Sequence, residues 1–384
     1  MTGSPPLRLP APDGGPVDLL VVAGEHSGDE HAARMVAGLL GRRPGLRIAA
    51  LGGPRLAAAG AHLLYDRTGL SVVGFGEVVR NFPFFRALIE ETVRWIGRHH
   101  PKAVCFVDNS GVNLRIAEAL RERGLSAKGG GTVRTLYYIS PQIWASRAGR
   151  RFDMARNLDS LAVIFPFEVG CYADTGLEVE FVGHPFMAQD YAPPVASDPS
   201  GPVLLLPGSR PKAVGLIAPA LLAGFAELSR SGLERNAVIL FPSEAIRAQL
   251  EGLGLPKQVT LQKTGRPVAA SAVLTSSGTM SMHCALAGIP GAIAYRTDVL
   301  TYLVARWLVR VPYLGIANIL LGEPMYPEFI QRAANPPALA GQLSLCLGDL
   351  SRRARTSAQA AELRAMLVNP AGVTEADWIS RNVP

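Results

Sequence analysis

Short apolar runs separated by glycine-rich turns recur along the chain, and the segments after many of them space their apolar residues as helices do. The first run, Leu19–Val22, leads into a turn containing Gly24 and Gly28. The next segment carries an apolar stripe at Met35, Val36, Leu39 and Leu40. A buried strand, a tight turn and a helix predict the opening unit of a doubly wound α/β domain.

The same alternation continues through both halves of the chain. The further expected strands are Ile48–Leu51, Ala103–Val107, Thr135–Ile139, Leu161–Phe165, Val179–Val182, Val203–Leu206, Ala237–Leu240, Val259–Leu261, Ala272–Thr275 and Ala292–Tyr295. An apolar helix is expected from about Leu216 to Leu228, with Pro219 tolerated only in its first turn. The pattern predicts two Rossmann-like domains whose strand ends face each other across a cleft.

Composition shifts set the expected domain boundaries. Residues 1–16 are rich in proline and glycine and read as a disordered tail. Residues 17–186 form the first domain, the aperiodic stretch 187–202 the linker, and 203–335 the second domain. Residues 336–384 have a helical pattern.

The overall composition fits a protein with a large core and anionic partners. Of 384 residues, 48% are hydrophobic and 18% charged, and the net charge is +7. This charge favours a nucleotide, a phosphorylated lipid or an acidic membrane, whereas no RNA-binding signature or Lys/Arg run supports nucleic acid. The four cysteines lack metal-ligand spacing and read as thiols of a reducing compartment. Without an apolar leader or an apolar stretch of membrane-spanning length, we expect a cytoplasmic protein that can touch a membrane.

One segment is more apolar than the inner face of a single element requires. Residues 72–85 hold eight valines and phenylalanines, and Arg80 and Arg86 flank or interrupt them. Two interpretations compete: ordinary core beneath a loop, or an exposed patch that dips into an acidic bilayer surface.

Candidate chemistry in the first half lies at strand ends. Asp108 directly follows the run Ala103–Val107, where its carboxylate can act as a general base, or can simply cap the next helix. Glu25 and Asp29 lie at the mouth of the first turn, where open parallel sheets bind ligands. The alternative for them is a βα turn with solvated acids and Asp29 as a helix cap.

The second half carries an expected diphosphate site. Ser277, Gly278 and Thr279 stand at the start of a helix, whose N–H groups suit phosphates. Arg210, in another loop after a strand, can neutralise the same phosphates. No Asp-x-Asp pair or His/carboxylate cluster suggests a metal, so no metal or other cofactor is expected. These residues favour group transfer from a nucleotide-diphosphate donor, with Asp108 taking the proton of an alcohol acceptor.

These motifs together resemble the lipid-A-disaccharide synthase family of GT-B glycosyltransferases. The similarity runs from about Asp18 to Gln331. The matching segments are Ala23–Asp29, Gly52–Gly60, Val73–Val79, Phe106–Asp108 with Asn113, Tyr137–Ala145, Ile164–Glu168, Phe181–Pro185, Leu205–Arg210, Ser276–Thr279, Ala294–Arg296, Leu300–Tyr313 and Ala317–Glu323. Each segment alone is weak evidence, but their order and spacing are specific.

The resemblance implies a reaction, its partners and a set of site residues. The family joins a UDP-linked diacylglucosamine to a diacylglucosamine 1-phosphate, inverting the anomeric centre to give a β-1,6 disaccharide and UDP. It implies a peripheral enzyme at the inner face of the cytoplasmic membrane, with a homodimer left open. The implied roles are catalytic for Asp108 and Glu25; substrate-binding for Ser27, Asp29, Asn113 and Asn318; nucleotide-binding for Ser209, Arg210, Ser277, Gly278, Thr279 and His283; and membrane-contacting for Val78, Val79, Phe82, Phe84 and Phe85. GT-B chains also often return their last segment to the first domain.

Four positions depart from the family pattern: Gly111, Ser146, Ala213 and His283. The first and third stand where the family has an acid, and Ser146 where it has a second tryptophan. His283 replaces a carboxylate that accepts both ribose hydroxyls, and a neutral imidazole can replace only one of those two bonds. Three hypotheses remain: a lipid A disaccharide synthase, a paralogue acting on another UDP-sugar (a transferase or an epimerase), and a non-catalytic protein that binds UDP-sugar or lipid.

Overall fold

The computed structural model describes residues 7–68, 82–298, 302 and 311–384. The chain divides into two units, residues 1–185 with 367–384, and residues 186–366. Each unit is built around its own parallel sheet, which confirms the prediction of two Rossmann-like domains.

The first unit contains a seven-stranded sheet in the order β3-β2-β1-β4-β5-β6-β7, with all pairs parallel. Its strands are β1 (Leu19–Ala23), β2 (Ile48–Gly52), β3 (His62–Asp66), β4 (Ala103–Val107), β5 (Arg134–Tyr138), β6 (Ser160–Val163) and β7 (Glu178–Phe181). Its helices are α1 (Glu25–Arg42), α2 (Pro54–Ala58), α4 (Phe82–His99), α5 (Ser110–Glu122), α6 (Arg150–Asn157) and α14 (Glu375–Asn382), with 3-10 turns η2 (Ala127–Gly129) and η3 (Pro166–Tyr172). The central strands β1 and β4 are fully buried, as continuous apolar runs predict.

The second unit contains a six-stranded parallel sheet in the order β11-β10-β9-β13-β14-β15. Its strands are β9 (Val203–Leu206), β10 (Ala237–Phe241), β11 (Val259–Lys263), β13 (Ala272–Thr275), β14 (Gly291–Tyr295) and β15 (Glu328–Ile330). Its helices are α7 (Pro211–Arg230), α8 (Glu244–Glu251), α9 (Thr279–Leu286), α11 (Ile316–Leu321), α12 (Pro336–Gly348) and α13 (Leu350–Leu367), with the turn η5 (Gln331–Ala333). A separate pair, β8 (Val195–Ser197) and β12 (Val268–Ala270), is also parallel.

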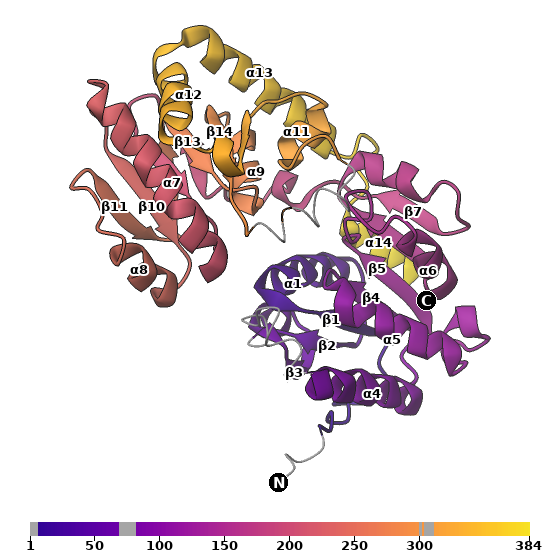
Figure 1. Ribbon diagram of the computed structural model, residues 1–384. Coiled ribbons are helices and arrows are strands. Elements are labelled where there is room, and N and C mark those ends of the chain that lie inside the picture. Colours follow the sequence, from indigo (N-terminus) through magenta and orange to yellow (C-terminus); the bar gives the residue numbers. More distant parts are fainter. Residues whose placement is uncertain (1–6, 69–81, 299–301, 303–310) are drawn as a thin grey trace. The chain divides into compact units, whose positions relative to one another are not determined.

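Helix α14 belongs to the first unit although it lies at the end of the chain, and the yellow helix is seen beside the purple strands in Figure 1. Trp378 is buried there, and its indole N–H donates to the Ser160 hydroxyl at 3.0 Å. Arg381 pairs with Glu180 of β7 at 2.9 Å. The last helix therefore covers the sheet of the first unit through both apolar and polar contacts.

Two expected boundaries are wrong. Within the described residues of the expected tail, Leu9 is buried and its N–H donates to Glu91, while the Pro10 carbonyl accepts from Trp95. These contacts pack the segment against α4, so it is not a disordered tail. The expected linker 187–202 contains β8, whose buried Val195 pairs with Val268, so this stretch is part of the second unit.

The expected helix at Leu216–Leu228 is also longer than predicted. It is α7, which begins at Pro211 and holds Pro219 in its interior rather than in its first turn. Nine of its residues are buried, and it packs closely against α12. Tertiary packing therefore offsets the hydrogen bond that Pro219 removes.

Candidate active site

The two strands at the centre of the first sheet end side by side. Ala23 of β1 is paired with Val107 of β4, and here the strand order changes direction. Open α/β sheets bind ligands in the crevice at this switch point. A Cβ on Gly24 would lie 2.1 Å from the Asn109 side-chain nitrogen, so a larger residue at this position would displace the Asn109 side chain.

Asp108 is the first residue after β4 at this point. Asp108 and Asn109 adopt left-handed backbone conformations (φ 50° and 43°), as does Glu25 opposite them (φ 60°). Such conformations cost about 1–2 kcal/mol for a residue with a side chain, and they cluster at functional sites. Three of them at one switch point favour a functional role for these loops.

The main chain of Asp108 is held firmly in place. Its N–H donates to the Tyr138 carbonyl at 3.0 Å, and its own carbonyl accepts from the Tyr137 hydroxyl at 2.6 Å and from the Asn113 amide at 2.9 Å. Burial raises the pKa of the Asp108 carboxyl, and a backbone hydrogen bond from Asn109 partly opposes this. A fixed carboxylate with a raised pKa is a stronger base than a solvated one.

Asn113 is fully buried and supports this loop from below. Its amide group also lies 3.3 Å from the Val22 carbonyl and 3.2 Å from the Val107 carbonyl, so it ties the ends of β1 and β4 together. The structure thus places Asn113 as a positioning residue beneath Asp108. Glu25 and Ser27, in the first turn of α1, are exposed at the same edge.

Asp29 has a different role from the one expected. It lies inside α1, whose cap is Gly24, so it does not cap that helix. Its side chain is 2% exposed and accepts from the N–H groups of Gly53, Arg55 and Leu56 at 2.8, 3.0 and 3.2 Å. The carboxylate therefore caps α2 and joins the first glycine motif to the second, and its hydrogen-bonding capacity is used inside the protein.

Replacing Asp29 with Ala should lower the free energy of unfolding by about 2–4 kcal/mol, because three backbone donors lose a charged acceptor. Chemical denaturation measures this, with Glu30→Ala as the control, since Glu30 forms an exposed ion pair with Arg55. If Asp29→Ala instead keeps wild-type stability and raises the KM of the acceptor, Asp29 binds substrate and the structural role is wrong.

The second unit repeats the arrangement with different side chains. Thr275 of β13 is paired with Leu206 of β9 at the switch point of the second sheet. The loops after these strands are joined by a hydrogen bond from the Ser276 N–H to the Leu206 carbonyl at 2.8 Å. The structure thus brings together the two segments 207–210 and 276–279 that the sequence assigned to a diphosphate.

Exposed donors line this pair of loops. Helix α9 begins at Thr279 with Gly278 as its cap residue, and no side chain of the described residues accepts from its first N–H groups. Ser209, Arg210, Gly278 and Thr279 are exposed, and Ser277 is half-buried. An uncapped helix start beside an arginine is suited to bind an anion.

His283 contacts two aromatic side chains. Its ring stacks on Phe186 with centroids 4.1 Å apart, and its Nδ1 lies 2.7 Å from the Tyr191 hydroxyl. Burial lowers the pKa of His283 to about 4, so the imidazole is neutral at pH 7. The Tyr191 hydroxyl also lies 3.4 Å from Nε2, so at most one ring nitrogen remains for a ribose hydroxyl.

Asn318 is placed where it stabilises the second unit. It is fully buried; its amide group donates to the Tyr326 carbonyl at 2.7 Å and to Glu328 at 2.9 Å, and its oxygen accepts from the Tyr326 N–H at 2.9 Å. These bonds tie α11 to β15. The structure therefore gives Asn318 a structural role in place of the expected substrate contact.

The expected membrane contacts are only partly described. Val78 and Val79 lie outside the described residues, and of Phe82 only its place at the start of α4 is described. Phe84 and Phe85 are half-buried, and Phe85 packs against the core of the first unit. Within the described residues, α7 alone is apolar and long enough to cross a bilayer, but half of that stretch is buried in the second unit.

Glu168 is a buried acid to which the sequence reasoning gave no role. It is 1% exposed and accepts from the indole N–H of Trp144 and from the Phe165 N–H, both at 3.2 Å. Burial raises its pKa from 4.5 to about 7. The segment Ile164–Glu168 carries only a family resemblance, and no periodicity marks its last residue as buried.

The raised pKa predicts a pH-dependent stability. The folded state retains the Glu168 proton at pH values where the unfolded chain has lost it, so stability falls as the pH rises from 4.5 to about 7. Between pH 4.5 and 7, the free energy of unfolding of Glu168→Gln should rise by on the order of 3 kcal/mol relative to that of the wild type. Denaturation curves of both proteins at pH 4.5 and pH 7 measure this difference, and Glu178→Gln, at an exposed position, serves as the control. A difference that does not vary with pH would contradict it.

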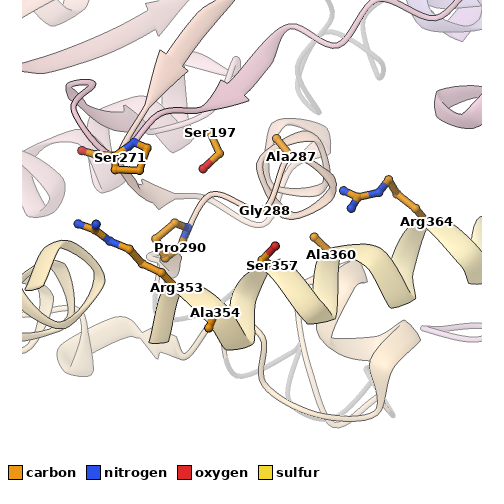
Figure 2. Close-up of a pocket in the computed structure, with 11 residues that line it drawn as sticks. Ser197, Ser271, Ala287, Gly288, Pro290, Arg353, Ala354, Ser357, Ala360 and Arg364 are labelled. Atoms are coloured by element: carbon orange, nitrogen blue, oxygen red, sulfur yellow. The ribbon is translucent and has the colours of Figure 1, made fainter. Parts of the chain in front are cut away.

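One cavity of about 330 Å³ lies in the second unit, and none of the predicted site residues lines it. Figure 2 shows Arg353, Ser357 and Arg364 spaced along α13, with Ser197 and Ser271 across from them. Both arginines donate to main-chain carbonyls, Arg353 to Cys346 and Arg364 to Leu286. The lining is therefore engaged in holding α13 in place. Among the described residues, no group of three or more His, Cys, Asp or Glu side chains could hold a metal ion.

Comparison with known proteins shows which family the chain belongs to. The family model described as lipid-A-disaccharide synthetase matches residues 19–380. The chain belongs to this family. The lipid-A-disaccharide synthase of Anaeromyxobacter dehalogenans strain 2CP-C is 34% identical over 370 residues, covering 92% of this chain and 94% of that protein. That of Trichlorobacter lovleyi is 34% identical, covering 88% and 89%.

Solved structures show the fold. A kitacinnamycin glycosyltransferase covers 98% of this chain and 100% of its own, with a TM-score of 0.58 and 17% identity. Acinetobacter baumannii MurG covers 95% and 98%, with a TM-score of 0.51 and 14% identity. Together with the family relatives, these neighbours support a GT-B glycosyltransferase of the lipid-A-disaccharide synthase family.

The remaining departures from the family pattern are accommodated locally. A Cβ on Gly111, in the first turn of α5, would meet no atom within 4 Å. Ala213 lies beneath the Gly208 loop, 4.0 Å from where a Cβ on that glycine would stand. Ser146 is half-buried, and its N–H lies 3.4 Å from the Gln142 carbonyl. These replacements thus leave both switch points intact.

Proposed function

We propose that the protein transfers diacylglucosamine from UDP-2,3-diacylglucosamine to 2,3-diacylglucosamine 1-phosphate, giving the β-1,6 disaccharide of lipid A and UDP. The observation that carries this proposal is the half-buried Asp108 at the switch point of the first sheet, in a chain of this family. The donor nucleotide binds the second unit and the acceptor the first.

The chemistry follows from the residues at the two switch points. The acceptor 6-hydroxyl attacks the anomeric carbon of the donor, and Asp108 takes the hydroxyl proton as the new C–O bond forms. The bond from the anomeric carbon to the β-phosphate oxygen breaks with inversion. Arg210 and the N–H groups at the start of α9 stabilise the charge that develops on the departing diphosphate. The scheme uses no metal.

Supporting roles are proposed for the other exposed residues of these edges. Glu25 and Ser27 contact the acceptor beside Asp108, while Ser209, Ser277, Gly278 and Thr279 contact the diphosphate. His283 contacts the ribose through Nε2, which lies farther from the Tyr191 hydroxyl than Nδ1 does. We place the reaction at the cytoplasmic face of the inner membrane because both substrates carry acyl chains.

Purified protein incubated with both lipid substrates tests the proposal directly. We expect one disaccharide and one UDP for each donor consumed, measured by thin-layer chromatography and mass spectrometry. A non-catalytic protein would bind UDP and release none from the donor. Conversion of UDP-GlcNAc to its epimer without disaccharide would show the epimerase alternative, and either result would refute the proposal.

A further inference from the structure

Among the residues that the structure describes, Arg67 is a buried cation without a counterion. It directly follows β3 at the carboxyl edge of the first sheet, and the residue is only 3% exposed. Its Nε and Nη1 have no hydrogen-bond partner, and it forms no ion pair with any residue that the structure describes. The Arg67 main-chain N–H donates to the Gly52 carbonyl at 2.6 Å, which fixes the residue at this edge.

Two acids near Arg67, Asp66 and Asp29, are committed to other donors. Asp66 accepts from the N–H and the hydroxyl of Thr68 at 2.8 and 2.6 Å. Asp29 accepts from the three N–H groups of the β2–α2 loop. Burial lowers the pKa of Arg67 to about 10, which still leaves it charged at pH 7. A buried unpaired charge is costly to keep, so an apolar residue of similar size would suit the fold better.

Arg67 and Asp108 share a neighbour. Tyr137 acts electrostatically on Arg67, opposing the effect of burial on its pKa, and the Tyr137 hydroxyl donates to the Asp108 carbonyl. The unpaired cation therefore belongs to the same edge of the sheet as the proposed base. A ligand that brings its own anion to this edge would meet the guanidinium.

We propose that Arg67 binds the phosphate monoester of the glycolipid acceptor and so selects a phosphorylated acceptor over its dephosphorylated form. The inference rests on the proposed function, because it assigns the acceptor to the first unit. A guanidinium with two unsatisfied N–H groups matches the oxygens of a phosphate monoester. The headgroup of an anionic phospholipid also carries a phosphate, and vesicle binding distinguishes it from the acceptor.

The test compares Arg67→Met and Arg67→Lys with Arg55→Met, which removes an exposed arginine paired with Glu30 at 2.7 Å on the neighbouring helix α2. With the phosphorylated acceptor, Arg67→Met should lower kcat/KM by about ten- to a hundredfold, and Arg67→Lys by less. With the dephosphorylated acceptor, all variants should match the wild type, and the donor KM should not change. An equal loss with both acceptors, or no loss, would overturn the proposal.

Two further measurements make the outcome decisive. Without ligand, Arg67→Met should melt at the wild-type temperature or above it, because it removes an unpaired buried charge; a variant that unfolds would show that Arg67 serves folding and would overturn the proposal. Vesicles containing phosphatidylglycerol should bind wild type and variant alike; a loss of vesicle binding in the variant would assign Arg67 to a phospholipid headgroup instead.

The proposed function can fail separately. If the wild type forms no disaccharide, glucosamine 1-phosphate still tests Arg67 as a soluble probe. It should raise the melting temperature of the wild type and of Arg55→Met but not that of Arg67→Met. If it shifts all three equally, or none, Arg67 does not bind the phosphate.

Discussion

Replacing Asp108 with Asn should lower kcat by about a hundred- to ten-thousandfold. The amide matches the carboxylate in size but cannot take the proton of the acceptor hydroxyl. The loop should keep its shape, because Tyr137 and Asn113 bind the main-chain carbonyl of residue 108 rather than its side chain. The KM values of both substrates should therefore change little.

The pH profile gives this prediction a second readout. The carboxylate form of Asp108 is the active one, so the wild-type rate should fall as the pH drops through its pKa, which burial raises above the usual value. The residual rate of Asp108→Asn should lack this acidic limb. Asp153→Asn, on the surface of α6, serves as the control and should behave as wild type. If Asp108→Asn keeps more than about a tenth of the activity, Asp108 is not the general base.

Replacing Arg210 with Met should lower kcat/KM for the donor by about a hundred- to a thousandfold, because the charge on the departing diphosphate loses a cation. Arg210 is exposed in the loop after β9, and the neighbouring strand β13 leads through its own loop into α9. Arg210→Lys should recover part of the activity, since an ammonium keeps the charge but lacks the planar pair of donors. Arg210→Met should also bind UDP more weakly than the wild type does, which calorimetry measures.

Helix α7, which follows Arg210 directly, offers a matched control. Arg230 lies at the opposite end of α7, where it pairs with Glu227 at 2.6 Å, and Arg230→Met should leave the kinetics unchanged. The acceptor KM should not respond to either substitution. If Arg210→Met changes the KM of the acceptor rather than that of the donor, the proposed assignment of the two substrates to the two units is wrong.

The sequence predicted the strands and loops that carry both switch points. Runs such as Leu19–Val22 and Ala103–Val107 are continuous in apolar residues and end at Gly or Asp, which is the pattern of strands buried on both faces. The family motifs then marked which loops carry chemistry. The positions of Asp108 and Arg210 at carboxyl ends of strands follow from these local signals alone.

Roles that depend on distant partners could not be read from the sequence. Asp29 caps a helix that begins 25 positions later, at Pro54, and His283 is held by Tyr191, 92 positions away. Asn318 looks like a site residue until Tyr326 and Glu328 are seen to use its amide. Burial decides each case, and hydrophobic periodicity does not report the burial of a single polar side chain.

The central claim is that the second unit holds the leaving diphosphate while Asp108 of the first unit activates the acceptor hydroxyl. A crystal structure with UDP and the phosphorylated acceptor tests it most directly. The account predicts the β-phosphate in hydrogen bonds with Arg210 and with the N–H groups at Gly278 and Thr279, and the acceptor 6-hydroxyl in a hydrogen bond with the Asp108 carboxylate. UDP bound elsewhere, or an acceptor hydroxyl out of reach of Asp108, would contradict it.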